Sequence, residues 1–159
     1  MNESLYLPDC VLGLGLEASS RGLRVVRFGA RVLPDKPGTI VRRAERQIRE
    51  YLAGERAEFD IPLDMEGSEF QIEVWQSLRK IPYGETRSYR DVARAVNRPK
   101  GFQAIGQANT RNPLPIIVPC HRVIAVDGGM GGYGGGLERK RILLETESRY
   151  AHRLRTTAA

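Results

Sequence analysis

The sequence predicts an α+β protein with a small N-terminal α/β domain over residues 1–60 and a mostly helical C-terminal domain over residues 61–150. Apolar segments punctuated by glycines indicate a small antiparallel sheet in the first domain. Two capping boxes, each just before an apolar run, indicate successive helices in the second domain. A polar tail follows at residues 151–159.

The first domain has a simple pattern of elements. Residues 11–16 and 22–28 alternate apolar side chains and glycines, which predicts a hairpin with its turn at residues 19–22. The apolar spacing over residues 39–53 fits an amphipathic helix whose arginines point outward into solvent. Residues 54–66 form a predicted linker. No motif in this part indicates chemistry, so its expected role is structural.

The second domain begins with a predicted helix at the capping box Ser68 to Gln71. Trp75 shares the apolar face of that helix, which favours a place in the core over a base-stacking role. The capping box Ser88 to Asp91 begins a second helix that stops near Asn97, and a third helix covers residues 101–110. Two short helices joined by a tight turn predict a helix-turn-helix.

The third helix has a face of small residues, and its outward candidates Gln103, Gln107 and Thr110 are uncharged. A small, smooth face permits close approach to a narrow groove, so this helix favours docking in the minor groove of DNA. The alternative is that the small residues only allow the helices to pack tightly.

One stretch, residues 116–124, combines a cysteine and a histidine with an apolar run. Three β-branched residues lead into Pro119, so Cys120 is expected at the end of a strand, with residues 123–126 as a returning strand. A histidine beside a cysteine can take the thiol proton, which makes Cys120 and His121 a plausible nucleophile pair. The alternative is a buried structural cysteine beside a satisfied histidine.

The composition limits the classes of protein. A net charge of +6 and a pI near 9.7 are consistent with a polyanionic partner. No segment approaches the ~20 apolar residues of a membrane span, and the N-terminus lacks a basic signal sequence, so we expect a cytoplasmic protein without membrane contact. Cys10 and Cys120 lie far apart in the chain and only two histidines are present, which argues against a zinc site, so we expect neither a metal nor a cofactor.

The run Pro-Cys-His-Arg-Val at residues 119–123 resembles the active-site signature of the O6-alkylguanine-DNA alkyltransferases, and the resemblance extends from Gly67 to Glu147. It implies direct-reversal DNA repair by a methylated-DNA-protein-cysteine S-methyltransferase. In such a protein the alkyl group of O6-alkylguanine, mainly O6-methylguanine, moves irreversibly to Cys120 after the base is flipped from the duplex. The implied partner is double-stranded DNA bound through its minor groove, and the implied protein is a monomer that acts once.

The resemblance also implies roles for individual residues. Glu147 would orient His121, which activates Cys120, and Tyr89 would press on the phosphate and assist the leaving guanine. Contacts to DNA or to the flipped base would come from a wider set of residues: Tyr89, Gln103, Asn112, Arg122, Tyr133, Gly134 and Gly135.

Two positions depart from the family's pattern. Gln103 stands where the family usually has an arginine that fills the vacated base stack, which predicts slower or weaker extrusion of the base but intact chemistry. Gly134 stands where some relatives have serine, which predicts a wider pocket or one lost contact to the base.

Two other classes stay open at this point. A cysteine hydrolase would also use Cys120 and His121, but it would turn over and need an oxyanion hole, for which no donors can be named. A binding protein that recognises alkylated DNA without repairing it would keep the fold and lack the cysteine. The presence of Cys120 argues against that class.

Overall fold

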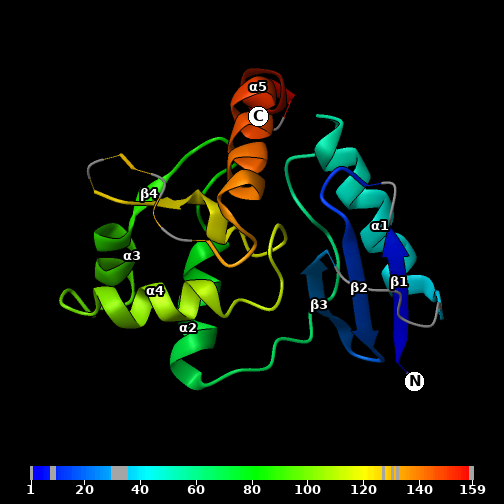
Figure 1. Ribbon diagram of the computed structural model, residues 1–159, viewed down its shortest axis with the longest axis horizontal. Helices are drawn as coiled ribbons and strands as arrows, with labels where there is room; N and C mark the ends of the chain where they lie inside the picture. Colours follow the sequence, from blue (N-terminus) through cyan, green and yellow to red (C-terminus); the bar gives the residue numbers. More distant parts are fainter. Residues whose placement is uncertain are drawn as a thin grey trace. The chain divides into compact units, whose positions relative to one another are not determined.

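The computed structural model describes residues 2–7, 10–29, 36–126, 128–129, 131 and 133–157 (Figure 1). The chain divides into two compact units between Glu66 and Gly67. The sequence placed this boundary at residue 60. Residues 61–66 join the first unit because Leu23 exchanges backbone hydrogen bonds with this segment, donating to Pro62 (2.8 Å) and accepting from Asp64 (2.9 Å).

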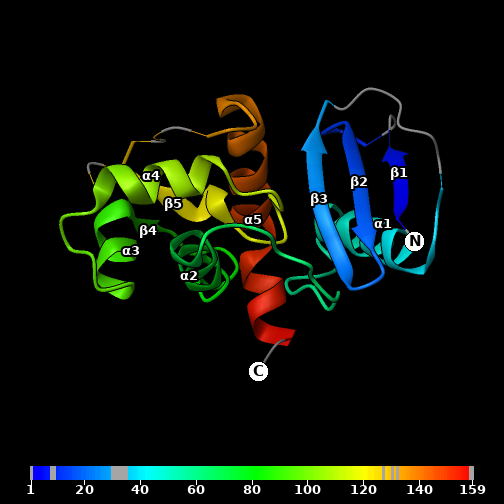
Figure 2. The ribbon, with the colours of Figure 1, turned by 90° about the horizontal axis from the view of Figure 1, so that it is seen from below.

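The first unit is a three-stranded antiparallel sheet with one helix against it. Its strands run in the order β1 (Glu3–Leu7), β2 (Leu14–Ser19) and β3 (Gly22–Phe28), and helix α1 (Thr39–Leu52) lies across one face (Figure 2). The predicted hairpin is β2 and β3, paired from Leu14 opposite Phe28 to Ser19 opposite Gly22. Strand β1 is an addition that the sequence pattern did not single out.

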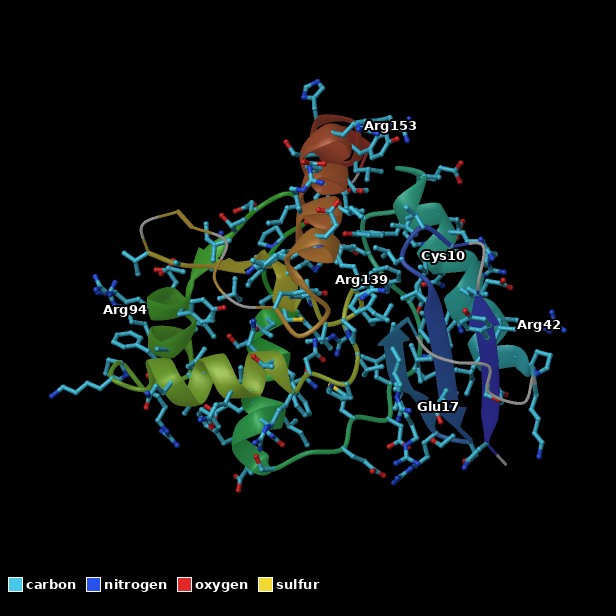
Figure 3. All side chains as sticks on the ribbon, viewed as in Figure 1. Cys10, Glu17, Arg42, Arg94, Arg139 and Arg153 are labelled. Atoms are coloured by element: carbon cyan, nitrogen blue, oxygen red, sulfur yellow. The ribbon has the colours of Figure 1, made fainter. Side chains whose placement is uncertain are left out.

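Helix α1 buries its apolar stripe and exposes basic residues, as its spacing predicts. Val41, Ala44 and Ile48 are fully buried against the sheet side, while Arg42 projects from the helix into solvent (Figure 3). The N-terminus of α1 receives its cap from another element, because the Glu3 carboxylate accepts hydrogen bonds from two backbone amides of the first turn.

The second unit carries the remaining elements: α2 (Glu69–Leu78), β4 (Arg87–Ser88), α3 (Tyr89–Ala95), α4 (Phe102–Thr110), the 3-10 turn η1 (Cys120–Arg122), β5 (Val123–Ile124) and α5 (Leu137–Thr157). Both predicted capping boxes are present, at Ser68 with Gln71 and at Ser88 with Asp91. Helices α3 and α4 pack on each other and on α2. Residues 151–157, expected in the polar tail, continue α5.

Trp75 ties α2 to α4 inside this unit. Its side chain is 1% exposed, and its indole Nε1 donates to the backbone oxygen of Ala108 (2.8 Å). A buried indole needs a partner for its single donor. The interpretation of Trp75 as a core residue is therefore confirmed, and α4 is anchored at its C-terminal half.

The prediction of a strand before Cys120 is wrong. Residues 114–118 form a tight turn, in which the Val118 amide donates to Leu114 O (2.8 Å) and Ile116 has a φ of 77°. Positive φ is costly for a β-branched residue, so packing decides this conformation against local propensity: Ile116 is 1% exposed. The returning strand, expected over residues 123–126, is also shorter than predicted. Strand β5 has only two residues and pairs in parallel with β4.

Among the residues that the structure describes, no helix is long and apolar enough to cross a membrane.

Candidate active site

Cys120 begins the turn η1, which contacts α2 and α5, and its side chain is almost fully enclosed. The residue is 3% exposed. Its backbone is fixed from both sides, because its amide donates to Val118 O (2.8 Å) and its carbonyl accepts from the Asn109 side-chain amide (3.3 Å). A thiol held this rigidly can present its sulfur in one direction, as a nucleophile requires.

The electrostatics of Cys120 balance two opposing effects. Burial raises the pKa of its thiol, because an enclosed thiolate loses its hydration. Hydrogen bonding from the Asn112 and Tyr133 side chains and the positive charge of Lys140 act in the opposite direction and lower that pKa. The site therefore supplies several groups that favour the thiolate once the proton has been removed.

Asn112 holds the turn that leads into Cys120. Its side-chain amide donates to Val118 O (2.8 Å), and its side-chain oxygen accepts from the Leu114 amide (2.9 Å). These two bonds close the loop in which Ile116 adopts its positive φ. Asn112 thus positions the cysteine by fixing the backbone before it and contributes to the electrostatics of the thiol.

Behind Cys120 lies a buried cluster built around the carboxylate of Glu147. His121 Nε2 lies 2.5 Å from one carboxylate oxygen. Arg122 donates to both oxygens, through Nε at 2.8 Å and Nη2 at 3.0 Å, and the Gly84 amide donates at 3.0 Å. Glu147 is 1% exposed and His121 is fully buried. The carboxylate on α5 and the imidazole in η1 therefore pair in a site that is shielded from water.

Charge pairing decides the protonation states in this cluster. Hydrogen bonds and the positive charge of Arg122 hold the pKa of Glu147 well below its usual range, despite burial. Burial lowers the pKa of His121, which keeps the imidazole neutral near pH 7. A neutral imidazole beside an ionised carboxylate donates from Nε2, which leaves the Nδ1 lone pair as the position that can accept a proton.

Arg122 is a buried member of this cluster. The sequence assigned it to contacts with DNA or with the base, but it is 6% exposed. Besides pairing with Glu147, it donates from Nη1 to Ile81 O (2.6 Å) and stacks over the Tyr83 ring at 5.7 Å. Its donors are used inside the unit, so it supports Glu147 and, through Glu147, the orientation of His121.

Lys140 is a site residue that the sequence analysis missed. It is fully buried, its Nζ donates to Val123 O (2.7 Å), and its charge interacts with Cys120. The signal was present in the spacing, because Lys140, Leu143 and Glu147 recur at the i, i+3, i+7 positions of one helix face. A lysine on the buried face of a helix is rarely accidental.

Tyr89 and Gln103 come together at a separate hollow of about 430 Å³ between α3, α4 and the segment after β5. The hollow is lined by Tyr89, Arg90, Phe102, Gln103, Gly106, Ala125 and Val126. Gln103 is exposed and Tyr89 is half-buried. The three outward positions predicted on α4, Gln103, Gln107 and Thr110, are all exposed.

The glycine-rich stretch, residues 128–136, approaches both Cys120 and the hollow lined by Tyr89. Residues 130 and 132 of this stretch lie outside the described part. Tyr133 is half-buried and interacts with Cys120, and Arg139 donates to Gly135 O (3.1 Å). Gly134 lies against α4: a Cβ there would be 3.0 Å from Thr110 O. A serine at residue 134 would therefore require a local shift of a few tenths of an ångström.

Gly131 lies close to the Tyr89 ring, and a substitution there tests the importance of that ring's position. Its φ is 65°, and a Cβ on it would lie 3.1 Å from the Tyr89 hydroxyl. We expect Gly131→Ala to displace the tyrosine ring and to slow any reaction that depends on Tyr89 by about tenfold, with about 1 kcal/mol of backbone strain. Gly128→Ala is the matched control, since Gly128 also has a positive φ (85°) but open space around its Cβ position. Equal rates for the two variants would contradict a role for the Gly131 contact.

Among the described residues, no group of three or more His, Cys, Asp or Glu side chains is arranged to hold a metal ion.

Comparisons with known proteins agree on one family. Residues 69–149 match the family model described as 6-O-methylguanine DNA methyltransferase, DNA binding domain. A methylated-DNA--protein-cysteine methyltransferase of Mycolicibacterium paratuberculosis is 54% identical over 108 residues, which cover 68% of this chain and 66% of that protein. The match thus spans about two thirds of that relative's length.

Solved structures extend the likeness to both units. The O6-methylguanine methyltransferase of Mycobacterium tuberculosis has a TM-score of 0.84 and 41% identity, over 94% of each chain. A structure of the Mycobacterium tuberculosis OGT in complex with DNA gives a TM-score of 0.83 and 42% identity, over 94% of this chain and 93% of that chain. With the family model covering half of its residues, this chain belongs to the 6-O-methylguanine DNA methyltransferase family.

Proposed function

We propose that this protein repairs O6-alkylguanine in duplex DNA by moving the alkyl group to Cys120. The observation that carries the proposal is the buried set Cys120, His121 and Glu147, inside a domain whose relatives are named methylated-DNA--protein-cysteine methyltransferases. Such an assembly provides a nucleophile, a base and a group that orients the base.

The chemistry follows from the protonation states of the site. Neutral His121 accepts the thiol proton at Nδ1, directly or through a water, while Glu147 stabilises the imidazolium that forms. The thiolate attacks the alkyl carbon, so that an S–C bond forms, the bond between that carbon and O6 breaks, and the electron pair leaves with guanine. The Tyr89 hydroxyl donates the proton that the departing guanine anion takes up and regains one from water. Lys140 and Asn112 stabilise the thiolate before attack.

The product explains why the protein would act only once. An S-alkyl cysteine is a thioether, which has no carbonyl for water to attack, in contrast to the thioester of a cysteine hydrolase. Each molecule therefore removes one alkyl group, and repair is stoichiometric with protein.

The target atom lies within the base stack, so the base must leave the duplex, at a cost of a few kcal/mol. Residues 89–111, which contain α3, α4 and their turn, carry five exposed cations and one carboxylate, Asp91. The cations are Arg90, Arg94, Arg98, Lys100 and Arg111; Arg94 extends outward from α3 (Figure 3). Contacts of these cations with phosphates would offset the cost of extrusion.

The small face of α4 supports docking in the minor groove. A Cβ on Gly106 would meet nothing within 4 Å, so this part of the helix is open to close approach. We propose double-stranded DNA as the partner of a monomeric protein, acting in the cytoplasm.

Replacing Gln103 with arginine is expected to strengthen DNA binding by about threefold to tenfold. The slope of log affinity against log salt concentration should steepen by about one, the change expected for one added phosphate contact. The reason is that Gln103 is exposed on the hollow beside Arg90 and adds no charge there. Titrations of fluorescent duplex at several salt concentrations measure both quantities. If neither DNA affinity nor the transfer rate changes, Gln103 does not limit this protein.

A radiolabelled substrate distinguishes alkyl transfer from damage binding and from cysteine hydrolysis. With duplex DNA carrying a radiolabelled O6-methyl group, we expect label to stay on the protein up to one equivalent. A damage-binding protein would retain the DNA without labelling itself, and a hydrolase would turn over an ester substrate many times.

A further inference from the structure

Phe102 is exposed where a large apolar side chain would ordinarily be buried. Four large apolar side chains are exposed among the described residues, and two of them, Phe102 at 44% and Val126 at 63%, line the same 430 Å³ hollow. Exposed apolar groups that gather at one concave place indicate a binding surface more strongly than scattered ones do. The hollow therefore has an apolar wall facing solvent.

Phe102 lies at the start of α4, where its ring is accessible to a partner. It is the first residue of the helix, and Gly106 follows one turn later on the same side. A Cβ at residue 106 would meet nothing within 4 Å, so among the described residues no group lies directly over this part of α4. The ring stands at the end of a helix that the Trp75 hydrogen bond anchors at Ala108.

The surroundings of the ring suit a polyanion. Arg90 lines the hollow, and Arg98 and Lys100 precede Phe102 in the turn between α3 and α4; all three are exposed. An apolar ring surrounded by cations matches a nucleic acid, whose phosphates bind the cations and whose base faces bind the ring. It would suit an apolar protein partner less well, because such a partner would desolvate the cations.

We propose that Phe102 is the wedge that enters the base stack when the target base leaves it, an inference that rests on the proposed repair function. Extrusion leaves a gap between neighbouring base pairs, and apolar side chains fill such gaps when proteins open the stack from the minor groove. Gln103 lines the same hollow, but its amide would have to give up hydrogen bonds to water on entering the stack. The phenyl ring has no such cost and offers a flat face.

The test compares duplex with single-stranded DNA, both carrying one O6-methylguanine, because only the duplex requires a wedge. Single-turnover transfer rates are measured for the full chain and for Phe102→Ala, Phe102→Leu and Gln103→Ala. Val11→Ala, which truncates an exposed apolar side chain (71%) in the first unit, is the matched control. Thermal unfolding verifies that each variant folds.

We expect Phe102→Ala to lower the ratio of the duplex rate to the single-strand rate about tenfold. Phe102→Leu should recover the ratio to within about twofold, because leucine is also an apolar wedge. A ratio for Phe102→Ala within twofold of the parent would overturn the inference, and so would a larger fall for Gln103→Ala. Absence of transfer from both DNAs in the parent protein would instead overturn the repair function itself.

Discussion

Replacing Glu147 with glutamine is expected to lower the free energy of unfolding by about 3–5 kcal/mol and to slow alkyl transfer by at least tenfold. The substitution preserves shape but removes the charge that pairs with buried Arg122 and orients His121. An uncompensated guanidinium would then remain in a site that is almost closed to water. Urea unfolding and single-turnover transfer measure the two effects.

Glu145→Gln is the matched control for this prediction. Glu145 lies two residues earlier on α5, where it is 58% exposed and pairs with Arg141. An exposed ion pair contributes at most about 1 kcal/mol, so this variant should unfold and react much like the parent. A comparable loss of stability in both variants would contradict the special role of the Glu147 cluster.

Acid should destabilise the protein through the same cluster. The pKa of Glu147 is lower in the folded state, so its contribution is present above the unfolded pKa near 4.5 and is lost as pH falls below it. The pKa of His121 is also lower in the folded state, so protonation favours unfolding as pH falls below about 6.5. Stability should thus decline from near pH 6.5 downward, and the part lost below pH 4.5 should be smaller in Glu147→Gln.

Replacing Lys140 with methionine is expected to slow transfer about tenfold at neutral pH, with a smaller loss at alkaline pH. The positive charge of Lys140 lowers the pKa of Cys120, so its removal raises that pKa further and leaves less thiolate. Methionine retains much of the stem but leaves Val123 O without the donor it now has, at a cost of about 1–3 kcal/mol.

Transfer rates measured from pH 6 to 9.5 test this account, with Arg141→Met as the control. Arg141 is the next residue on α5 and is 54% exposed. Its replacement should therefore leave the dependence of the transfer rate on pH unchanged. The expected result for Lys140→Met is an alkaline displacement of the profile. A profile that superimposes on that of the parent would exclude an electrostatic role for this lysine.

Local signals in the sequence predicted the helices of the second unit well. The capping boxes at Ser68 and Ser88 specify helix starts through bonds between residues three apart, and both form. Trp75 was correctly assigned to the core because its helical spacing places it on an apolar face. Such features depend on neighbours in the chain, so they can be recognised without a structure.

Features decided by distant contacts could not be predicted in the same way. The run before Pro119 has strand-forming residues, yet Asn112 and the burial of Ile116 impose a turn. The parallel pair β4 and β5 has two residues per strand, too short to leave a periodic signal. The burial of Arg122 depends on Glu147, 25 residues later in the chain. The sequence pointed to Cys120, His121 and Glu147 but not to Lys140, whose burial is set by the packing of α5.

The central claim is that Cys120 receives the alkyl group. The most direct measurement is the intact mass of the protein after incubation with duplex DNA carrying one O6-methylguanine, beside Cys120→Ala. The account predicts a single gain of about 14 Da, one methyl group replacing one proton, and no gain in the variant. No gain in the parent protein despite tight DNA binding would contradict the account and would indicate a protein that recognises the damage without repairing it.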